Sequence, residues 1–516
     1  MLSLMKSAGI MMSIENQLLT LTLDTPLHKA SPEQLVFFER FCDVSNLFQN
    51  VFGISDHTRW LVFKSDKMKS QFIPGKGSKN EPNDNDIARK VAGMRYMLQN
   101  QHHKMLCLDG DTQQEIYEKA PQFITNEHSF NEESFVLRNS TWTNIHAALL
   151  LLRDPVNEDP NFLSGVVNSL EKQVPTNCNV FCNPGIIQKQ LVSAQKLHNI
   201  LINSHPYVKE HVMLVTHACH RQSSERNTEE ILEKYKLILK ILLIFSDRFG
   251  CSNVGVCTRK GTLAGQTQPH LHDHVLGFNS ECVDDQLWVQ HWVSDLLNRP
   301  IDQLPAHEAI NKIKTIMPRL FCPIKGIVFD IGGVVVKQFN KEVEWLKKLF
   351  PNTDYTSFLK ELTEGRKDEN LFWEEMCREH GLTYDDEFRG KWKEIYLESN
   401  PICEKVIEAI KGFRERNLKI YALSNTILSH YLINEERGLF CFDGMVHSHQ
   451  VGMSKPAPEI YTKLLEITGL NPEELLFVDD KKENVRAGQE AGMHAFLWKN
   501  EDYGIDRIEA YLNFKE

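Results

Sequence analysis

Three histidines stand two residues apart in the segment 264–278, which has the sequence A-G-Q-T-Q-P-H-L-H-D-H-V-L-G-F. Successive side chains of a β-strand alternate between the faces of a sheet, so this spacing predicts that His270, His272 and His274 lie on one side. Imidazole titrates near neutral pH, and a ring that donates a hydrogen bond through one nitrogen can act through the other as a nucleophile or base. We therefore expect His272 to carry chemistry and the two outer rings to position it.

This segment resembles the signature of the histidine-triad superfamily of nucleotide hydrolases and transferases, G-Q-[ST]-x-x-H-x-H-x-H followed by apolar residues. The resemblance implies that His272 attacks the α-phosphorus of a nucleotide and carries the nucleotidyl group covalently. It also implies that Gln266 and Thr267 bind phosphate oxygens, while His270 and His274 orient the nucleophile and relay protons. Such a mechanism needs a free attacking nitrogen on a ring whose opposite N–H is held by an acceptor.

Two residues depart from the family pattern. Asp273 stands where the family prefers an apolar residue, and Arg259 stands where it often has an asparagine. These departures imply an altered leaving-group side of the site. They also keep open a different class of function, a nucleotide-binding regulatory protein in which one or both sites are inactive.

A metal site is another interpretation of the histidine row, and three surface histidines without a function are a third. Histidines on one face can bind a metal, and the chain also supplies Cys178, Cys182, His217 and His220 upstream. The C-x-x-x-C spacing is looser than that of a typical zinc knuckle. A structural Zn²⁺ therefore stays an alternative to the nucleotidyl chemistry.

The chain before the histidine row predicts elements that would position it. Residues 227–249 place apolar side chains three and four positions apart, which predicts a long amphipathic helix. Asn227 and Glu230 have the spacing of a capping box, and Gly250 follows as a terminator. A strand over residues 253–257 and a glycine-bearing loop then lead to the histidines, in the element order of the histidine-triad family.

A second set of chemically active residues follows apolar, β-branched runs nearer the C-terminus. Asp330 interrupts the run I-K-G-I-V-F-D-I-G-G-V-V-V, Ser424 ends a predicted strand, Lys455 precedes a predicted helix, and Asp479 and Asp480 end another strand. In an open α/β sheet, buried parallel strands deliver such side chains at their C-terminal ends. We therefore expect these residues to converge at one edge of a parallel sheet.

Together these segments resemble the haloacid dehalogenase superfamily of aspartyl-phosphate enzymes, in its glucose-1-phosphatase-like branch, from residue 324 to the C-terminus. The resemblance implies that Asp330 is the nucleophile that accepts the phosphoryl group, and that Lys455 neutralises charge beside it. It further implies a Mg²⁺ ion held by Asp330, Asp480 and the carbonyl of Gly332, and phosphate binding by Ser424 and Asn425. Two anions meet in this reaction, so a divalent cation and a lysine have to cancel their repulsion.

Gly332 is the departure from the phosphatase pattern, because most phosphatases of the superfamily have a second aspartate at this position as general acid and base. The glycine predicts a slower leaving-group step or a proton donor from elsewhere. The alternative is an inactive domain kept as a scaffold.

The resemblance also implies a helical cap over residues 340–400, which would close over the site and select the substrate. Aromatic residues are frequent in this segment, and we expect most of them to form the core of the cap itself. They are Trp345, Phe350, Phe358, Phe372, Trp373, Trp392 and Tyr396.

Length and composition agree with two enzymatic domains in one chain. The 516 residues predict about three folding units, and a hydrophobic fraction of 41% with 25% charged residues is ordinary for globular domains. The net charge of −11 makes nucleic-acid binding an unfavoured function, since that needs lysine and arginine clusters. The 12 cysteines follow no disulfide spacing, and the apolar stretch near the N-terminus is too short for a signal peptide or membrane span. We expect a cytoplasmic protein with reduced thiols; the oligomeric state stays open.

These observations predict an α+β domain followed by an α/β domain. Residues 1–175 form an extension of unclear fold without internal repeats, residues 176–320 form the histidine-triad-like domain, and residues 323–516 form a Rossmann-like parallel sheet with its cap. The function that we expect is bifunctional: a nucleotidyl group is cleaved or transferred through a histidine intermediate, and a phosphomonoester is hydrolysed. A galactose-1-phosphate uridylyltransferase-like or phosphorylase-type enzyme coupled to a sugar-phosphate phosphatase is the alternative among enzymes.

Overall fold

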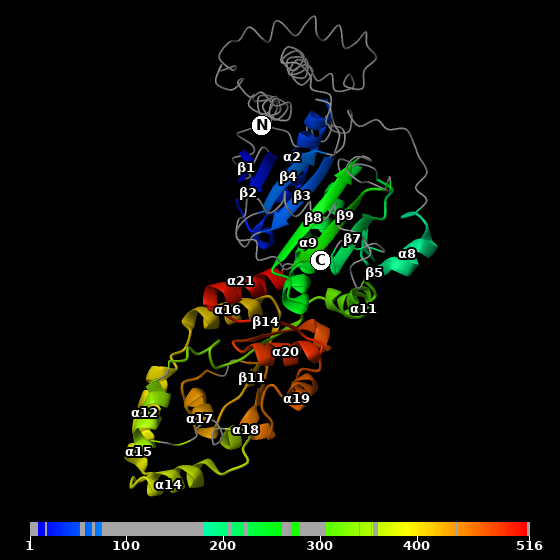
Figure 1. Ribbon diagram of the computed structural model, residues 1–516. Helices are drawn as coiled ribbons and strands as arrows, with labels where there is room; N and C mark the ends of the chain where they lie inside the picture. The colour runs from blue at the N-terminus through cyan, green and yellow to red at the C-terminus, as the bar shows by residue number, and fades with distance from the viewer. Residues whose placement is uncertain are drawn as a thin grey trace, which may run out of the picture. The chain divides into compact units, whose positions relative to one another are not determined.

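The computed structural model divides the chain into two compact units, Met1–Pro318 and Arg319–Glu516, each described here by itself (Figure 1). The structure describes residues 9–15, 18–51, 57–63, 68–74, 180–203, 206, 208–220, 225–260, 268, 270–278, 306–339, 341–351, 353, 360–439 and 442–512.

An antiparallel sheet of nine strands forms the first unit, with the order β1-β2-β4-β3-β8-β9-β7-β6-β5. Its two long helices, α2 and α9, contact one another. The strands are β1 (Ile10–Glu15), β2 (Leu18–Leu23), β3 (His57–Phe63), β4 (Met68–Pro74), β5 (Leu191–Ala194), β6 (His198–Ile202), β7 (Glu210–Thr216), β8 (Asn253–Lys260) and β9 (His272–Phe278), and the helices are α2 (Pro32–Val51), α8 (Pro184–Gln190), α9 (Thr228–Phe249) and α11 (Ala306–Ile316).

Helix α9 confirms the amphipathic helix that the sequence predicts. The side chain of Asn227 accepts a hydrogen bond from the backbone of Glu230, whose own side chain accepts from the backbone of Asn227. Gly250 ends the helix with a φ of 71°, a left-handed conformation that suits glycine. Strand β8 follows, and it is three residues longer than the expected strand because it continues to Lys260.

The first unit repeats one arrangement of elements, which the sequence does not reveal as an internal repeat. Strands β1 and β2, helix α2, and strands β3 and β4 form one half; β6, β7, α9, β8 and β9 form the other. From either side of the sheet toward its centre the strand order is the same, β1-β2-β4-β3 and β6-β7-β9-β8, and the halves meet through the antiparallel pair of β3 and β8. Strand β4, in the place of the histidine strand β9, contains no histidine. We call residues 10–74, which contain His28 and His57 but no histidine row, the N-terminal half of this unit.

Five parallel strands in the order β12-β11-β10-β13-β14 form the sheet of the second unit. This confirms the expected α/β fold, and the antiparallel sheet above confirms the α+β fold before it. The strands are β10 (Gly326–Phe329), β11 (Lys419–Ser424), β12 (Gly444–His447), β13 (Leu475–Asp479) and β14 (His494–Leu497), and the helices are α12 (Lys341–Leu349), α14 (Glu369–Glu379), α15 (Asp386–Ser399), α16 (Glu404–Glu415), α17 (Leu428–Glu436), α18 (Ser448–Val451), α19 (Pro458–Thr468), α20 (Lys482–Glu490) and α21 (Glu501–Leu512).

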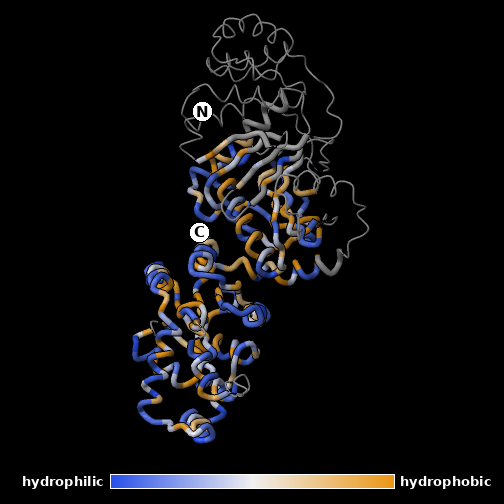
Figure 2. The backbone as a smooth tube through the Cα atoms, turned by 60° about the vertical axis from the view of Figure 1, so that its left-hand side comes forward, coloured by the Kyte–Doolittle hydropathy of each residue, from blue (hydrophilic) through white to orange (hydrophobic). Residues whose placement is uncertain are grey.

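Helices α12, α14 and α15 form the inserted segment between β10 and β11. Five of the expected aromatic residues are buried together in one cluster, Phe350, Phe372, Trp373, Trp392 and Tyr396, and Trp345 packs against it half-buried. They form the core of this segment, as expected, whereas Phe358 lies outside the described residues. In the second unit, hydrophobic residues are concentrated in the inner strands, and hydrophilic residues are frequent on the outer helices (Figure 2).

Among the residues that the structure describes, no helix has the length and apolar character needed to cross a membrane.

Candidate active sites

Strand β9 begins at His272, so His272 and His274 share one face of the strand while His270 lies just before it. The ring centroids of His272 and His274 are 4.8 Å apart. His272 Nδ1 donates a hydrogen bond to the backbone carbonyl of His270 over 2.8 Å. Because a carbonyl only accepts, the proton of the neutral ring stands on Nδ1 and the lone pair on Nε2. We had expected the ring of His270 to position His272. The contact is made instead by the backbone carbonyl of His270.

Two residues that the sequence analysis missed complete the surroundings of the histidines. His211, on the neighbouring strand β7, forms a hydrogen bond between its Nε2 and Nδ1 of His274 over 3.0 Å. The ring of Phe181 lies 5.0 Å from that of His272. The signal in the sequence for His211 is only that it precedes a short apolar run, V-M-L-V at residues 212–215, since its partner is 63 residues away.

The ring of His270 faces a pair of cysteines. Its Nε2 donates to the carbonyl of Thr216 over 3.0 Å, and its Nδ1 lies 3.5 Å from Sγ of Cys182. Cys182, Cys219 and His270 offer ligand atoms that all lie within 4.8 Å of one another. Burial lowers the pKa of His270 to about 4, so its ring is neutral at physiological pH.

The ligand set that we expected for zinc is therefore corrected. Nε2 of His220 is bound to the carboxylate of Glu230 over 2.9 Å, and Cys219 stands in the cluster instead. Cys178 lies outside the described residues, as do Gln266 and Thr267, the expected phosphate-binding residues. The side chain of Arg259 is not described either.

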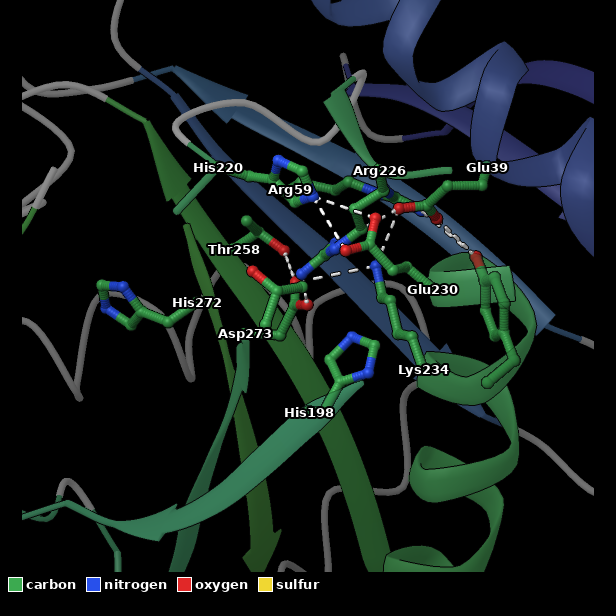
Figure 3. A network of polar contacts seen from close by, with 12 residues as sticks. Glu39, Arg59, His198, His220, Arg226, Glu230, Lys234, Thr258, His272 and Asp273 are labelled. Carbon is green, nitrogen blue, oxygen red and sulfur yellow. Dashed lines mark hydrogen bonds and ion pairs between the residues drawn. The ribbon is translucent and has the colours of Figure 1, made fainter. Parts of the chain in front are cut away.

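Asp273 does not share the face of His272, because neighbours along a strand point to opposite sides. Figure 3 shows Asp273 directed toward Arg226, Lys234 and Thr258 while His272 points away from them. The Asp273 side chain is fully buried, and Arg226 donates to it over 2.5 Å. Although burial alone would raise it, Arg226 and Lys234 lower the pKa of Asp273 to about 2. The departure from the family pattern thus leaves the histidine face of β9 unaltered.

In the second unit, the candidate residues meet at the C-terminal ends of three neighbouring strands. Asp330 follows β10, Ser424 ends β11, and Asp479 ends β13. Strand β10 pairs in parallel with both of the others, which brings the three ends to one edge of the sheet. The side chains of all three residues are buried.

Lys455 joins the two innermost carboxylates of this site. Its Nζ lies 2.9 Å from Oδ1 of Asp330 and 2.7 Å from Oδ2 of Asp479. Burial raises the pKa of Asp330 to about 7, with Lys455 opposing and Asp479 adding to the rise. Burial acts against the charge on Lys455, yet Asp330 and Asp479 hold its pKa above the usual value. The lysine is therefore a fixed positive charge beside the candidate nucleophile.

Asp480 completes a cluster of three carboxylates, which offer atoms within 4.8 Å of one another. Burial, with the nearby charge of Asp479, raises the pKa of Asp480. Its Oδ1 is buried without a hydrogen-bond partner. Gly333 has a φ of 78°, and a Cβ there would lie 2.5 Å from Oδ2 of Asp480, so this glycine lets the carboxylate approach the backbone. An oxygen-lined site with an unsatisfied carboxylate fits a hard divalent cation.

Asn425, which we expected to bind phosphate, contacts the backbone of Lys455. Its side chain accepts a hydrogen bond from the backbone N–H of Lys455 over 2.8 Å and donates to the Lys455 carbonyl over 2.9 Å. The amide thus braces the lysine. Asn484 is a supporting residue that we did not expect, and its side chain donates to both oxygens of Asp479 over 3.0 and 3.1 Å. The signal that could have identified it is the spacing V-D-D-x-x-x-N over residues 478–484.

Gly332 lies against the side chain of Gln338. A Cβ at Gly332 would collide with Nε2 of Gln338, so a carboxylate at this position needs the glutamine to move. Gln338 is exposed, and its side chain is flexible enough to do so.

Comparisons with known proteins identify a family for the second unit and a domain within the first unit. A family model described as haloacid dehalogenase-like hydrolase matches residues 324–492, and the HIT domain model matches residues 185–281. D-ribitol-5-phosphate phosphatase of Bacteroides thetaiotaomicron is 31% identical over 197 residues, which cover 34% of this chain and 93% of that protein. Enolase-phosphatase E1 of Persephonella marina is 28% identical, over 33% of this chain and 86% of that protein.

Among solved structures, a predicted HAD-like family hydrolase from Porphyromonas gingivalis matches 36% of this chain and 98% of its own with 24% identity and a TM-score of 0.33. A haloacid dehalogenase family enzyme from Bacteroides thetaiotaomicron, in complex with magnesium and inorganic phosphate, matches 34% of this chain and 94% of its own with 24% identity and a TM-score of 0.31. The family models and the 31% identical relative show that the chain belongs to the haloacid dehalogenase-like hydrolases through residues 324–492 and carries a HIT domain at residues 185–281.

Proposed function

We propose that this chain is a bifunctional enzyme. Its HIT domain cleaves or transfers a nucleotidyl group through a covalent intermediate on His272, and its second unit hydrolyses a phosphomonoester through an aspartyl-phosphate on Asp330. The observation that carries the proposal is that each nucleophile has the surroundings that its chemistry requires. A hydrogen bond fixes the tautomer of His272, and the ammonium group of Lys455 lies beside Asp330.

The HIT half of the proposal rests on the hydrogen bond from His272 Nδ1 to the carbonyl of His270. Because the proton stays on Nδ1, the Nε2 lone pair attacks the α-phosphorus, a P–N bond forms, and the P–O bond to the leaving phosphate breaks. The positive charge that then develops on the ring is stabilised by the same carbonyl. His274, linked to His211, lies beside the ring to relay a proton.

The phosphatase half rests on the contacts of Asp330. Its carboxylate attacks the phosphorus of a phosphomonoester, the ester P–O bond breaks, and water then releases phosphate from the aspartyl-phosphate. Lys455 offsets the charge of the two approaching anions, and Asn425 and Asp479 hold this lysine in place. The Ser424 hydroxyl, at the end of β11, would donate to a phosphoryl oxygen.

Asp330, Asp480 and the carbonyl of Gly332 would hold Mg²⁺, whose charge favours the ionised nucleophile and neutralises the transferred group. Support comes from the three clustered carboxylates and the unsatisfied Oδ1 of Asp480. A raised pKa of Asp330, at about 7, is the expected state of this carboxyl without a cation.

Cys182, Cys219 and His270 are the residues that we propose for a structural Zn²⁺ in the HIT domain. The tautomer of His270 fits, because Nε2 carries the proton that binds Thr216 and Nδ1 faces the cysteines. Metal analysis of purified protein tests this: about one zinc per chain that is lost in Cys182→Ser and Cys219→Ser supports it, and a zinc-free, fully active protein contradicts it.

The two activities form a natural sequence of steps. Cleavage of a nucleotide conjugate at the α-phosphorus leaves the other half as a phosphomonoester, which is the substrate class of the second unit. Similarity to a D-ribitol-5-phosphate phosphatase over 93% of that protein supports a phosphorylated sugar or polyol as that monoester.

A metabolite screen with purified protein and Mg²⁺ tests the proposal, comparing wild type with His272→Ala and Asp330→Asn. We expect His272→Ala to stop nucleotide cleavage and Asp330→Asn to let the phosphomonoester accumulate. If a trapped nucleotidyl-histidine is discharged by a phosphorylated acceptor rather than by water, the enzyme is a transferase. The proposal is contradicted if the protein turns over neither nucleotides nor phosphomonoesters and binds no Mg²⁺ by calorimetry. That result would favour a regulatory protein.

A further inference from the structure

A buried charge network lies behind the strand that carries His272 (Figure 3). Its five ionisable members are Glu39, Arg59, Arg226, Lys234 and Asp273, and each of their side chains is at most 3% exposed. The chemistry proposed for His272 uses none of them. Burying five charges is costly unless each is well paired, so this network calls for a reason beyond stability.

Arg226 and Lys234 link the two carboxylates of the network. Arg226 contacts Asp273 over 2.5 Å and Glu39 over 3.6 Å. Lys234 contacts Glu39 over 2.8 Å and Asp273 over 3.6 Å. Removing the charge of either carboxylate therefore changes the balance of forces on both cations, and through them on the other carboxylate.

Asp273 connects the network to the nucleophile. It lies between His272 and His274 on β9 and is held from three directions, by Arg226, by Lys234 and by the hydroxyl of Thr258. His272 is oriented by a backbone carbonyl, that of His270. The position of its Nε2 therefore depends on where the backbone of residues 270–274 lies, and Asp273 anchors that backbone from the opposite face.

The N-terminal half of the unit supplies the far end of the network. Glu39 lies on α2 and Arg59 on β3, and the two pair over 2.8 Å. Tyr235 of α9 also donates to Glu39, over 2.7 Å. Three cations face two carboxylates in this network, so loss of the Glu39 charge leaves Asp273 as its one remaining carboxylate and Arg59 without its ion pair to Glu39. Uncompensated buried charge is strongly unfavourable, and we expect Arg226 and Lys234 to shift.

We propose that Asp273 is a positioning residue for His272, and that Glu39 of the N-terminal half completes its setting. The inference rests on the function proposed for His272. Its consequence is that residues 10–74, which carry no histidine row of their own, contribute to catalysis by fixing β9. A nucleophile displaced by about 1 Å can lose about 10²-fold in rate, which sets the scale of the expected effect.

The kinetic test compares wild type with Glu39→Gln, Asp273→Asn and the double variant Glu39→Gln/Lys234→Met, well below each unfolding midpoint. The substrates are nitrophenyl esters of nucleoside 5′-monophosphates. We expect Glu39→Gln and Asp273→Asn to lower kcat by about 10- to 10²-fold with KM nearly unchanged, because the nucleophile is misplaced while the binding residues remain. The double variant removes one cation with one anion, so its kcat should recover toward wild type.

Glu233→Gln is the matched control. Glu233 lies on α9 and forms a partly buried ion pair, over 2.6 Å, with His198 on β6 rather than with Asp273 or a cation of the network. We expect this variant to lose stability and keep its kcat. If it lowers kcat as much as Glu39→Gln does, any loss of packing in this unit is sufficient and the positioning role is overturned.

A spectroscopic readout separates this inference from the proposed function. Proton–nitrogen NMR of histidine-labelled protein reports whether the proton of the His272 ring stands on Nδ1 or Nε2, with His272→Gln for assignment. We expect one tautomer, Nδ1–H, in wild type and a mixture in Glu39→Gln. If wild type has no nucleotidyl activity but the tautomer responds in this way, the proposed function fails and the positioning stands. Unchanged tautomer and kcat in Glu39→Gln, with His272→Ala inactive, overturn the positioning alone.

Discussion

The two candidate nucleophiles differ in where the protein places charge around them. Charges converge on Asp330: Lys455 lies 2.9 Å away, and Asp479 and Asp480 belong to the same cluster. Among the described residues near β9, the charged network around Asp273 lies on the face opposite to His272, whose ring is held by a backbone carbonyl. A carboxylate that attacks an anion needs its charge offset, whereas a neutral imidazole needs only the right tautomer and position.

The comparison explains why the two sites respond differently to burial. The pKa of Asp330 is raised to about 7, because an anion among carboxylates is unfavourable away from water. The pKa of Asp273 is lowered to about 2, because Arg226 and Lys234 outweigh its burial. In the first unit, the buried charges around Asp273 are thus paired with one another on the face opposite to His272. In the second unit, the Asp330 carboxylate lies in a setting that a cation would stabilise.

The sharpest test of this difference is removal of each nucleophile. We expect Asp330→Asn to lower aryl phosphate hydrolysis by about 10⁴-fold or more and to leave nucleotidyl transfer unchanged, and His272→Ala to do the reverse. Steady-state rates of both activities on the same preparations measure this. Equal loss of both activities in either variant would contradict independent sites.

Chelation should produce the next largest difference. EDTA is expected to lower the activity at Asp330 by about 10²-fold or more, because the clustered carboxylates then repel the incoming phosphate, and to spare the activity at His272. Adding back Mg²⁺ should restore the first activity. If EDTA stops nucleotidyl transfer first, a metal bound at Cys182, Cys219 and His270 is required for it.

Gly332 tests whether the phosphatase site lacks a proton donor. In Gly332→Asp we expect hydrolysis of alkyl phosphates to rise by about 10-fold relative to that of aryl phosphates, since only the former need protonation of the leaving group. The double variant Gly332→Asp/Gln338→Ala should show the larger gain, because Gln338 occupies the space that the new carboxylate needs. Gln338→Ala alone is the control. Single-turnover rates that fall on both esters would show instead that the glycine is needed at the site.

The smallest effect concerns stability. Folding raises the pKa of the Asp330 carboxyl from about 4 in the unfolded chain to about 7 in the native state. The ionised carboxylate therefore destabilises the native state increasingly as the pH rises from about 4, and this destabilisation is complete above about pH 7. Asp330→Asn should therefore raise the thermal unfolding midpoint in EDTA at pH 8, and raise it less at pH 5. The shift should be about 2–4 °C for each 1 kcal/mol gained in the free energy of unfolding. Thermal unfolding at the two pH values checks the sign. A lower midpoint at pH 8 would mean that the pair with Lys455 outweighs the burial of Asp330.

Local patterns in the sequence determined much of this molecule. The boundaries of α9 follow from Asn227, Glu230 and Gly250, because capping depends on residues within one helical turn. Asp330 and Ser424 were found at strand ends for a similar reason, since an apolar run that ends in a polar residue marks the edge of a buried parallel strand.

The tertiary structure alone decided which residues surround the nucleophiles. Strand alternation places Asp273 opposite His272, but only the packing of α9 shows that the opposite face is buried and charged. Glu39 and Lys234 are 195 residues apart, and no local pattern pairs them. The repeated arrangement of the first unit is likewise carried by strand order and not by shared residues. Burial, and the compensation that it demands of each charge, depends on contacts between distant segments, so the sequence by itself specified the reactive residues and only the fold specified how they are held.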